Sequence, residues 1–106
     1  MIFIYMVYYA CAVSKVADPK LSSKGKLSYE WASSHMPILT KTIEKLEKRK
    51  PLHGIGVGLC LHITKETSVL AVGSKRLGAN VSICAANPLS TQDDIAAFLA
   101  SQGINV

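Results

Sequence analysis

The chain has 106 residues, of which 49% are hydrophobic and 18% are charged. This length accommodates one small hydrophobic core and excludes a self-contained two-domain enzyme, and the apolar content excludes an intrinsically disordered chain. The formal net charge is +5, and residues 15–50 carry all of this excess. The lysines between residues 41 and 50 are not interleaved with aromatic residues, so we interpret them as a solvated helix face and expect no nucleic-acid partner.

Residues 1–13 form an uncharged, apolar run at the amino terminus. The run is shorter than the roughly 20 residues that cross a bilayer, and no cationic residue precedes it as in a secretory signal. We therefore expect residues 1–14 to form an amino-terminal extension of unknown role, and we expect no membrane partner. An edge strand, an interfacial segment and a mis-assigned start remain open for this run.

The three cysteines, Cys11, Cys60 and Cys84, are odd in number and contain no CxxC pair. This pattern predicts neither a disulfide framework nor a zinc site and is typical of a reducing compartment, so a cytoplasmic location is expected. Cys60 and Cys84 fall in predicted strands, where we expect them to pack as small, buried and unreactive side chains.

Residues 15–50 are predicted to form a helical lead-in of two helices. In the first, over residues 21–35, the spacing of Leu27, Trp31 and Met36 predicts one apolar stripe. Proline is tolerated in a first helical turn and disfavours helix in the residue before it, so the second helix should begin at residue 37 and end before residue 51. Its apolar face is predicted to contain Ile38, Leu39, Ile43 and Leu46.

Residues 51–106 alternate between apolar runs and helical spacing. Strands are predicted over residues 55–61 and 79–85, helices over residues 64–77 and 91–102, and the start of a third strand over residues 104–106. The strands are apolar throughout, which is typical of a parallel sheet that helices cover on both faces. The predicted fold class is therefore α/β, with a β-α-β-α-β unit that forms a partial parallel sheet of Rossmann-like type after the helical lead-in.

Gly54, Gly56 and Gly58 lie before and within the first predicted strand. A dinucleotide-binding fingerprint requires GxGxxG between a strand and a helix, so these glycines favour close approach of a neighbouring element over a phosphate cradle. His35 and His53 have no clustered metal-ligating neighbours, and no metal site is predicted.

Two polar loops follow the first two predicted strands, at the edge of a parallel sheet where ligands bind. The candidate site residues are His62, Thr64 and Glu66 in the first loop and Asn87, Ser90 and Gln92 in the second. An imidazole at the end of a buried strand is suited to proton transfer. For a lone histidine, however, a structural role remains slightly favoured.

A purely structural role for the same polar residues, at the starts of the two helices, stays open. The hydroxyls of Thr64 and of Ser90 or Thr91 can cap the helices that follow. Acidic residues at a helix start interact favourably with its dipole. The acidic residues in question are Glu66, Asp93 and Asp94.

Four segments together resemble the amino-terminal part of the adenosylhomocysteinase (S-adenosylhomocysteine hydrolase) family. They are KVADPKLSSKGKLSYEWASSHMPIL, GLCLHITKETSVL, LGANV and ANPLSTQDDIAAFLASQGINV, and they span residues 15–106 in the order of the family. The combination of CLHxTxET with NPLSTQDD is the most specific part of this resemblance.

The resemblance implies the start of a substrate-binding domain in an NAD-dependent hydrolase that reversibly splits S-adenosyl-L-homocysteine into adenosine and L-homocysteine. In that family, NAD oxidises the ribose 3'-hydroxyl, the 5' substituent is exchanged by elimination and water addition, and the ketone is reduced again. By motif, His62 matches the histidine that serves in acid/base chemistry near the 5' position, and Thr64 and Glu66 match residues that meet the adenine. The second-loop residues match the other side of the same cleft.

Members of the family are several times longer, and their later chain supplies the residues that hold the ribose and the NAD. The sequence is therefore expected to be an amino-terminal fragment that is inactive alone and has no cofactor of its own. It is expected to bind adenosine or S-adenosylhomocysteine weakly if at all, and to form homo-oligomers or pair with full-length subunits. The alternative is a non-enzymatic interaction module that pairs with a full-length homologue through an exposed sheet edge.

Overall fold

The computed structural model describes residues 14–87 and 89–106, so the prediction for the apolar run at residues 1–13 lies outside the described residues. In chain order the elements are the 3-10 helix η1 (Pro19–Leu21), α2 (Ser22–Ser34), α3 (Pro37–Leu46), the 3-10 helix η2 (Glu47–Arg49), β1 (Gly56–Leu61), α4 (Lys65–Arg76), β2 (Asn80–Ala85) and α5 (Asp93–Ser101). The α/β fold class is confirmed. Within the described residues, no helix is long and apolar enough to cross a membrane.

The two strands are parallel neighbours, in a register that pairs Gly56 with Asn80 and ends with Leu61 opposite Ala85. The predicted third strand is present as a single parallel bridge between Ser82 and Asn105. The backbone N–H of Ile83 donates to the carbonyl of Asn105 at 2.8 Å. The carboxyl-terminal residues therefore extend the sheet on the far side of β2 from β1.

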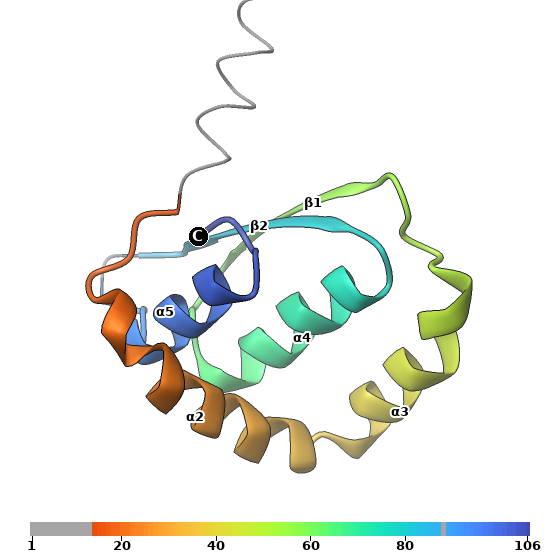
Figure 1. Ribbon diagram of the computed structural model, residues 1–106, viewed down its shortest axis with the longest axis horizontal. Coiled ribbons are helices and arrows are strands. Elements are labelled where there is room, and N and C mark those ends of the chain that lie inside the picture. Colours follow the sequence, from red (N-terminus) through yellow and green to blue (C-terminus); the bar gives the residue numbers. More distant parts are fainter. Residues whose placement is uncertain (1–13, 88) are drawn as a thin grey trace, which may run out of the picture.

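Helices α4 and α5 cover one face of this sheet, and α2 runs across the side of both helices that is remote from the strands (Figure 1). The core lies between the sheet and the helices, where Ile83, Ile95 and Leu99 are at most 3% exposed. Alternate strand residues point into this core, so Val81 and Ile83 are buried while the flanking Asn80 and Cys84 are exposed.

The opposite face of the sheet is uncovered by the described residues, which differs from the prediction of a sheet covered on both faces. Gly56, Gly58 and Cys60 of β1 are exposed there. A Cβ atom built on either glycine would meet no atom within 4 Å. The expectation that these glycines admit a neighbouring element is therefore wrong for the described part of the chain, and the expectation that Cys60 and Cys84 are buried is wrong as well.

Helix α2 packs through small residues instead of the predicted apolar stripe. Leu27 and Trp31 are 68% and 52% exposed, whereas Gly25 and Ala32 are buried. A Cβ atom on Gly25 would clash with the backbone carbonyl of Asp94 in α5. The close approach of these two helix backbones selects the glycine face and leaves the larger side chains outside.

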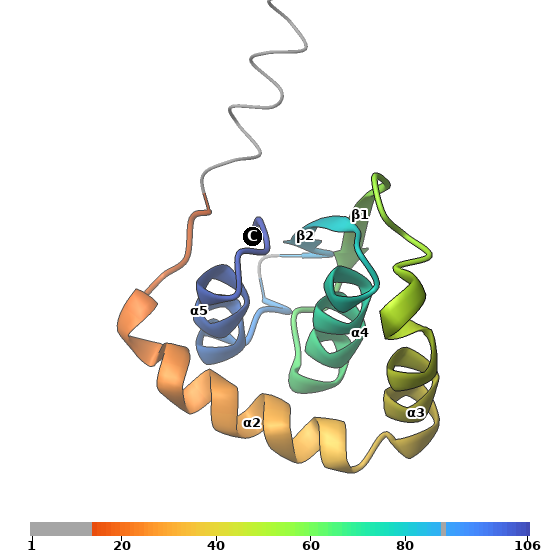
Figure 2. The same cartoon turned by 45° about the vertical axis from the view of Figure 1, so that its right-hand side comes forward.

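Helix α3 lies beside α4 (Figure 2) and contributes one buried side chain, that of Ile43. Its predicted apolar face is only partly correct, because Ile38 is 84% exposed. The side chain of Ile43 lies against Gly73 in α4, where a Cβ atom would collide with it. This contact explains a glycine inside a helix, where it costs about 1 kcal/mol relative to alanine.

Candidate functional site

The two polar loops meet at one edge of the sheet, as the parallel arrangement predicts. The chain leaves the sheet after Ala85 and pairs with it again at Thr91, opposite Ile63. The backbone N–H of Ile63 donates to the carbonyl of Ser90 at 2.9 Å, and its carbonyl accepts from the N–H of Gln92 at 2.8 Å. Because Ile63 is only 2% exposed, these bonds anchor both loops to the core.

The first loop places His62 before a capping box and Glu66 within it, and both residues are on the surface. Thr64 is the N-cap of α4, and its hydroxyl accepts a 3.4 Å hydrogen bond from the N–H of Thr67. The Thr67 hydroxyl in turn accepts from the N–H of Thr64 at 3.0 Å. The capping interpretation of Thr64 is thus confirmed, and Glu66 lies in the positively polarised first turn of the helix.

The position of His62 is set by its main chain and not by its ring. Its carbonyl accepts a 2.6 Å hydrogen bond from the Thr67 hydroxyl. Within residues 14–87 and 89–106, neither the imidazole of His62 nor the carboxylate of Glu66 has a hydrogen-bond partner. Both side chains are exposed and are therefore available to a ligand.

Polar side chains of the second loop bond to the backbone of the same loop. The Ser90 hydroxyl donates to the carbonyl of Asn87 at 2.9 Å and accepts from the N–H of Asn87 at 3.2 Å. The amide oxygen of Asn87 accepts from the N–H of Leu89 at 2.9 Å. Ser90 and Asn87 therefore shape the loop.

Neither Ser90 nor Thr91 caps the second helix, which corrects that part of the local interpretation. The N-cap of α5 is Gln92, and its side chain makes no bond to its own helix. Its Oε1 instead accepts a 3.2 Å hydrogen bond from the N–H of Lys65, the first residue of α4. The reason is positional: the chain rejoins the sheet at Thr91 and begins the helix only after that residue.

Two further polar features at this edge were missed by the sequence analysis. Thr67 organises the first loop, and the TxxT spacing of residues 64 and 67 is a local signal for such a cap. The Nζ of Lys65 lies 4.1 Å from the ring centroid of Trp31, which stacks on His35 at 4.0 Å. No local pattern links Trp31 with Lys65, because the contact depends on how α2 crosses α4.

A hollow of about 340 Å³ lies next to the loops, between the amino-terminal segment, β2 and α5. Its polar lining comes from Lys15, Thr91 and Asp93, and none of the six candidate site residues lines it. The candidate residues therefore surround an open surface edge in the described structure.

The described residues do not fit a dinucleotide or a metal ion. The three glycines at residues 54, 56 and 58 lie before and within β1, not between a strand and a helix, so they form no phosphate cradle. Within residues 14–87 and 89–106, no group of three or more histidine, cysteine or acidic side chains is arranged to hold a metal.

Comparison with known proteins places the sequences of both loops in one protein family. Residues 13–106 match the S-adenosyl-L-homocysteine hydrolase family. The chain belongs to this family. The match includes both polar loops and the helical lead-in, and it confirms the resemblance carried by the CLHxTxET and NPLSTQDD motifs.

Individual relatives come from archaea and bacteria. The chain is 48% identical over 92 residues to an adenosylhomocysteinase of Saccharolobus solfataricus, an alignment that covers 87% of this chain and 22% of the relative. It is 44% identical over 91 residues to an S-inosyl-L-homocysteine hydrolase of Methanopyrus kandleri, with 86% and 22% covered. An adenosylhomocysteinase of Thermotoga maritima is 45% identical over 82 residues, with 77% and 20% covered. The chain thus spans about a fifth of the length of the curated relatives that it matches.

Proposed function

We propose that this chain belongs to the substrate-binding domain of an NAD-dependent S-adenosyl-L-homocysteine hydrolase. In this proposal, the sheet edge with the two polar loops recognises the adenine and carries the histidine for acid/base chemistry. One observation carries the proposal: the two loops with the family motifs are joined at a single sheet edge by the bonds of Ile63 to Ser90 and Gln92. The substrate class is a nucleoside thioether, and adenosine is the part of it that this edge would bind. A cytoplasmic location and homo-oligomeric assembly belong to the same proposal.

Glu66 is suited to recognise adenine. A carboxylate only accepts hydrogen bonds, so Glu66 pairs with the exocyclic amino group of adenine and opposes the carbonyl oxygen of hypoxanthine. The proton of the Thr67 hydroxyl is directed to the carbonyl of His62. In the 3.3 Å contact of the two hydroxyls, Thr64 is therefore the donor to Thr67, and it can donate to a ring nitrogen by exchanging this long bond for one to the ligand.

His62 is assigned the proton exchange at the 5' position. Its backbone is held by the Thr67 hydroxyl while its imidazole is exposed, so the ring can approach a ligand with either nitrogen. In the second loop, Gln92 uses its Oε1 to cap α4 and retains its amide N–H groups for the ligand. Asn87 and Ser90 hold this loop in shape beside it.

NAD supplies the oxidation and re-reduction of the ribose in this proposal, and the residues described here do not fit it. We assign no cofactor-binding residue to the chain and expect it to release no adenosine from S-adenosylhomocysteine when NAD is added. Sustained hydrolysis by the purified chain would contradict this expectation.

Isothermal titration of the chain with adenosine and with inosine tests the base-recognition proposal. Adenosine should bind more tightly than inosine, and Glu66→Gln should weaken adenosine binding by about tenfold or more, because a hydrogen bond to a charged group is lost. Glu30→Gln is the matched control, since Glu30 is an exposed acid on α2. Equal affinities for the two nucleosides, or no heat with either at about millimolar concentration, would contradict the proposal.

A second candidate function is a non-enzymatic module that pairs with a full-length homologue. The observation that favours it is the edge of β1, which has no strand neighbour among the described residues because β2 occupies only its other side. Such an edge presents unpaired backbone groups to an incoming strand. Co-elution of the chain with a full-length homologue on size exclusion would support this function. The carbonyls of Ile55 and Leu61 face β2, so the backbone N–H of Gly58 faces the open edge, and loss of co-elution on Gly58→Pro would locate the contact.

A further inference from the structure

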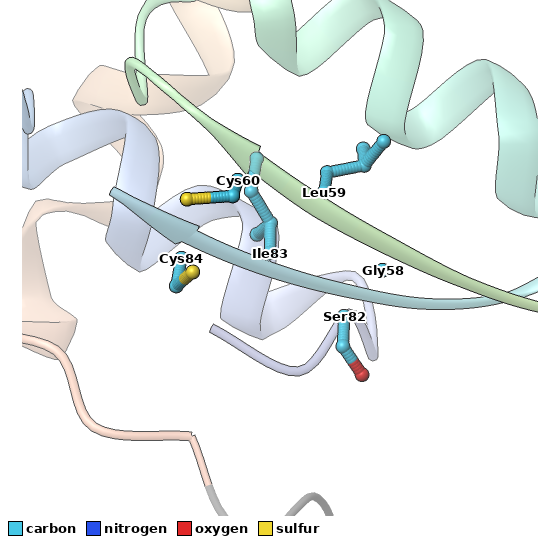
Figure 3. Close-up of a pocket in the computed structure, with 6 residues that line it drawn as sticks. All are labelled: Gly58, Leu59, Cys60, Ser82, Ile83 and Cys84. Carbon is cyan, nitrogen blue, oxygen red and sulfur yellow. The ribbon is translucent and has the colours of Figure 1, made fainter. Parts of the chain in front are cut away.

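Cys60 and Cys84 form a pair on the uncovered face of the sheet. They are direct partners in the parallel register of β1 and β2, and both are exposed. Figure 3 shows their sulfur atoms at the same end of the two strands, beside a hollow of about 320 Å³. The acid/base and base-recognition roles proposed above involve neither residue.

The spacing of these cysteines is compatible with a disulfide. Neighbouring strands lie about 4.7 to 4.9 Å apart, and disulfides join Cα atoms about 4.4 to 6.8 Å apart. The residues that precede them on the same face are Gly58 and Ser82, which are small. A reagent can therefore reach both sulfur atoms from the uncovered side.

The two thiols already interact. A hydrogen bond with Cys60, together with repulsion from a negative charge on Cys60, raises the pKa of the Cys84 thiol. The two thiols are thus close enough to act on one another across the strands.

We propose that Cys60 and Cys84 are a thiol–disulfide modification site, which a small-molecule disulfide such as oxidised glutathione converts to a cross-strand disulfide. The thiolate of one cysteine attacks one sulfur of the reagent, a mixed disulfide forms, and one glutathione thiolate leaves. The other cysteine then loses its proton to the solvent and attacks the protein sulfur of the mixed disulfide, which releases the second glutathione. The two protein thiols are oxidised, and one glutathione disulfide is reduced to two glutathione molecules.

The bond would tie β1 to β2 directly below the polar loops. Cys60 lies two residues before His62, and Cys84 lies three residues before Asn87. Exposed disulfides of this kind are readily reduced, so the cross-link should form and open with the ratio of oxidised to reduced glutathione.

Intact-protein mass measurement of the Cys11→Ser chain tests the proposal, because only Cys60 and Cys84 remain. After treatment with oxidised glutathione, the folded chain should lose the mass of two hydrogen atoms and carry no glutathione, and excess reduced glutathione should reverse the change. Cys60→Ser or Cys84→Ser in the same background should instead retain one glutathione. Circular dichroism of each variant establishes that it is folded.

The same chain unfolded in urea provides the reference. Because the fold holds the two sulfur atoms together, the ratio of internal disulfide to glutathione adduct should be about tenfold or more higher in the folded chain. A folded chain that accumulates glutathione on either cysteine, or that forms only disulfide-linked dimers, would overturn the proposal.

Discussion

The side chain of Gln92, the N-cap of α5, accepts a hydrogen bond from the backbone of Lys65, the first residue of α4. The N–H of Lys65, like the other N–H groups in the first turn of a helix, has no acceptor within α4. The side chain of Gln92, at the start of α5, supplies that acceptor. The two polar loops are consequently coupled by a side chain as well as by the backbone bonds of Ile63.

Removal of this amide should weaken the fold. Gln92→Ala is expected to lower the free energy of unfolding by about 1 kcal/mol, because the Lys65 N–H loses its partner at a helix start. Urea denaturation measures the change. Gln102→Ala is the control, since Gln102 follows the end of α5 and its side chain makes no hydrogen bond within the described residues; an equal effect of the two substitutions would show that the Gln92 bond contributes nothing.

The hydroxyl of Thr67 should contribute more than that of an ordinary helical threonine. Thr67→Val keeps the shape of the side chain but removes its bonds to the N–H of Thr64 and the carbonyl of His62. We expect a loss of about 1 to 2 kcal/mol in the free energy of unfolding. Thr42→Val removes only a bond to the carbonyl of Ile38 on an exposed helix face and should change stability by less than about 0.5 kcal/mol.

The packing of Ile43 on Gly73 should reverse the usual effect of a glycine-to-alanine change. Alanine is the better helix former by about 1 kcal/mol, but its Cβ would collide with the end of the Ile43 side chain. Overpacking costs about 1 to 3 kcal/mol, so after the gain from alanine Gly73→Ala is expected to lower the free energy of unfolding by up to about 2 kcal/mol. Thermal or urea unfolding of Ile43→Val, Gly73→Ala and the double variant checks the contact, and strictly additive effects would argue against it.

The ion pair of Glu47 and Arg76 predicts a pH dependence of stability. The Arg76 guanidinium, 2.7 Å from the Glu47 carboxylate, lowers the pKa of Glu47 through a hydrogen bond. A carboxyl group with a lowered pKa in the folded state stabilises the fold above its pKa in the unfolded chain and loses this contribution as the pH falls through the folded value. Wild type should therefore exceed Glu47→Gln in stability at about pH 7 and match it at about pH 3.

Urea denaturation at the two pH values measures this difference, with Glu30→Gln as a control for the loss of one negative charge. The effect should be small, because both side chains are more than a third exposed to solvent, at 37% for Glu47 and 35% for Arg76. A larger stability difference at low pH than at neutral pH would contradict the assignment.

Local patterns were sufficient to locate most of the elements and the loops that follow the strands. Helix spacing, Pro37 and the apolar strand runs place each helix start and each strand within two residues of the structure. The same patterns could not show which face of a helix is buried. Leu27 and Trp31 have the spacing of a core stripe, yet α2 is held by Gly25, because a close backbone approach to α5 stabilises the fold only where no side chain intervenes.

The sequence by itself determined the α/β class, the parallel order of strands and helices and the identity of both polar loops, because these depend on residue type and spacing along the chain. Only the tertiary structure decided that Gln92 caps the neighbouring helix and that Cys60 and Cys84 share an uncovered face. Both facts depend on which residues of different segments become neighbours, and on which face of the sheet the helices leave open.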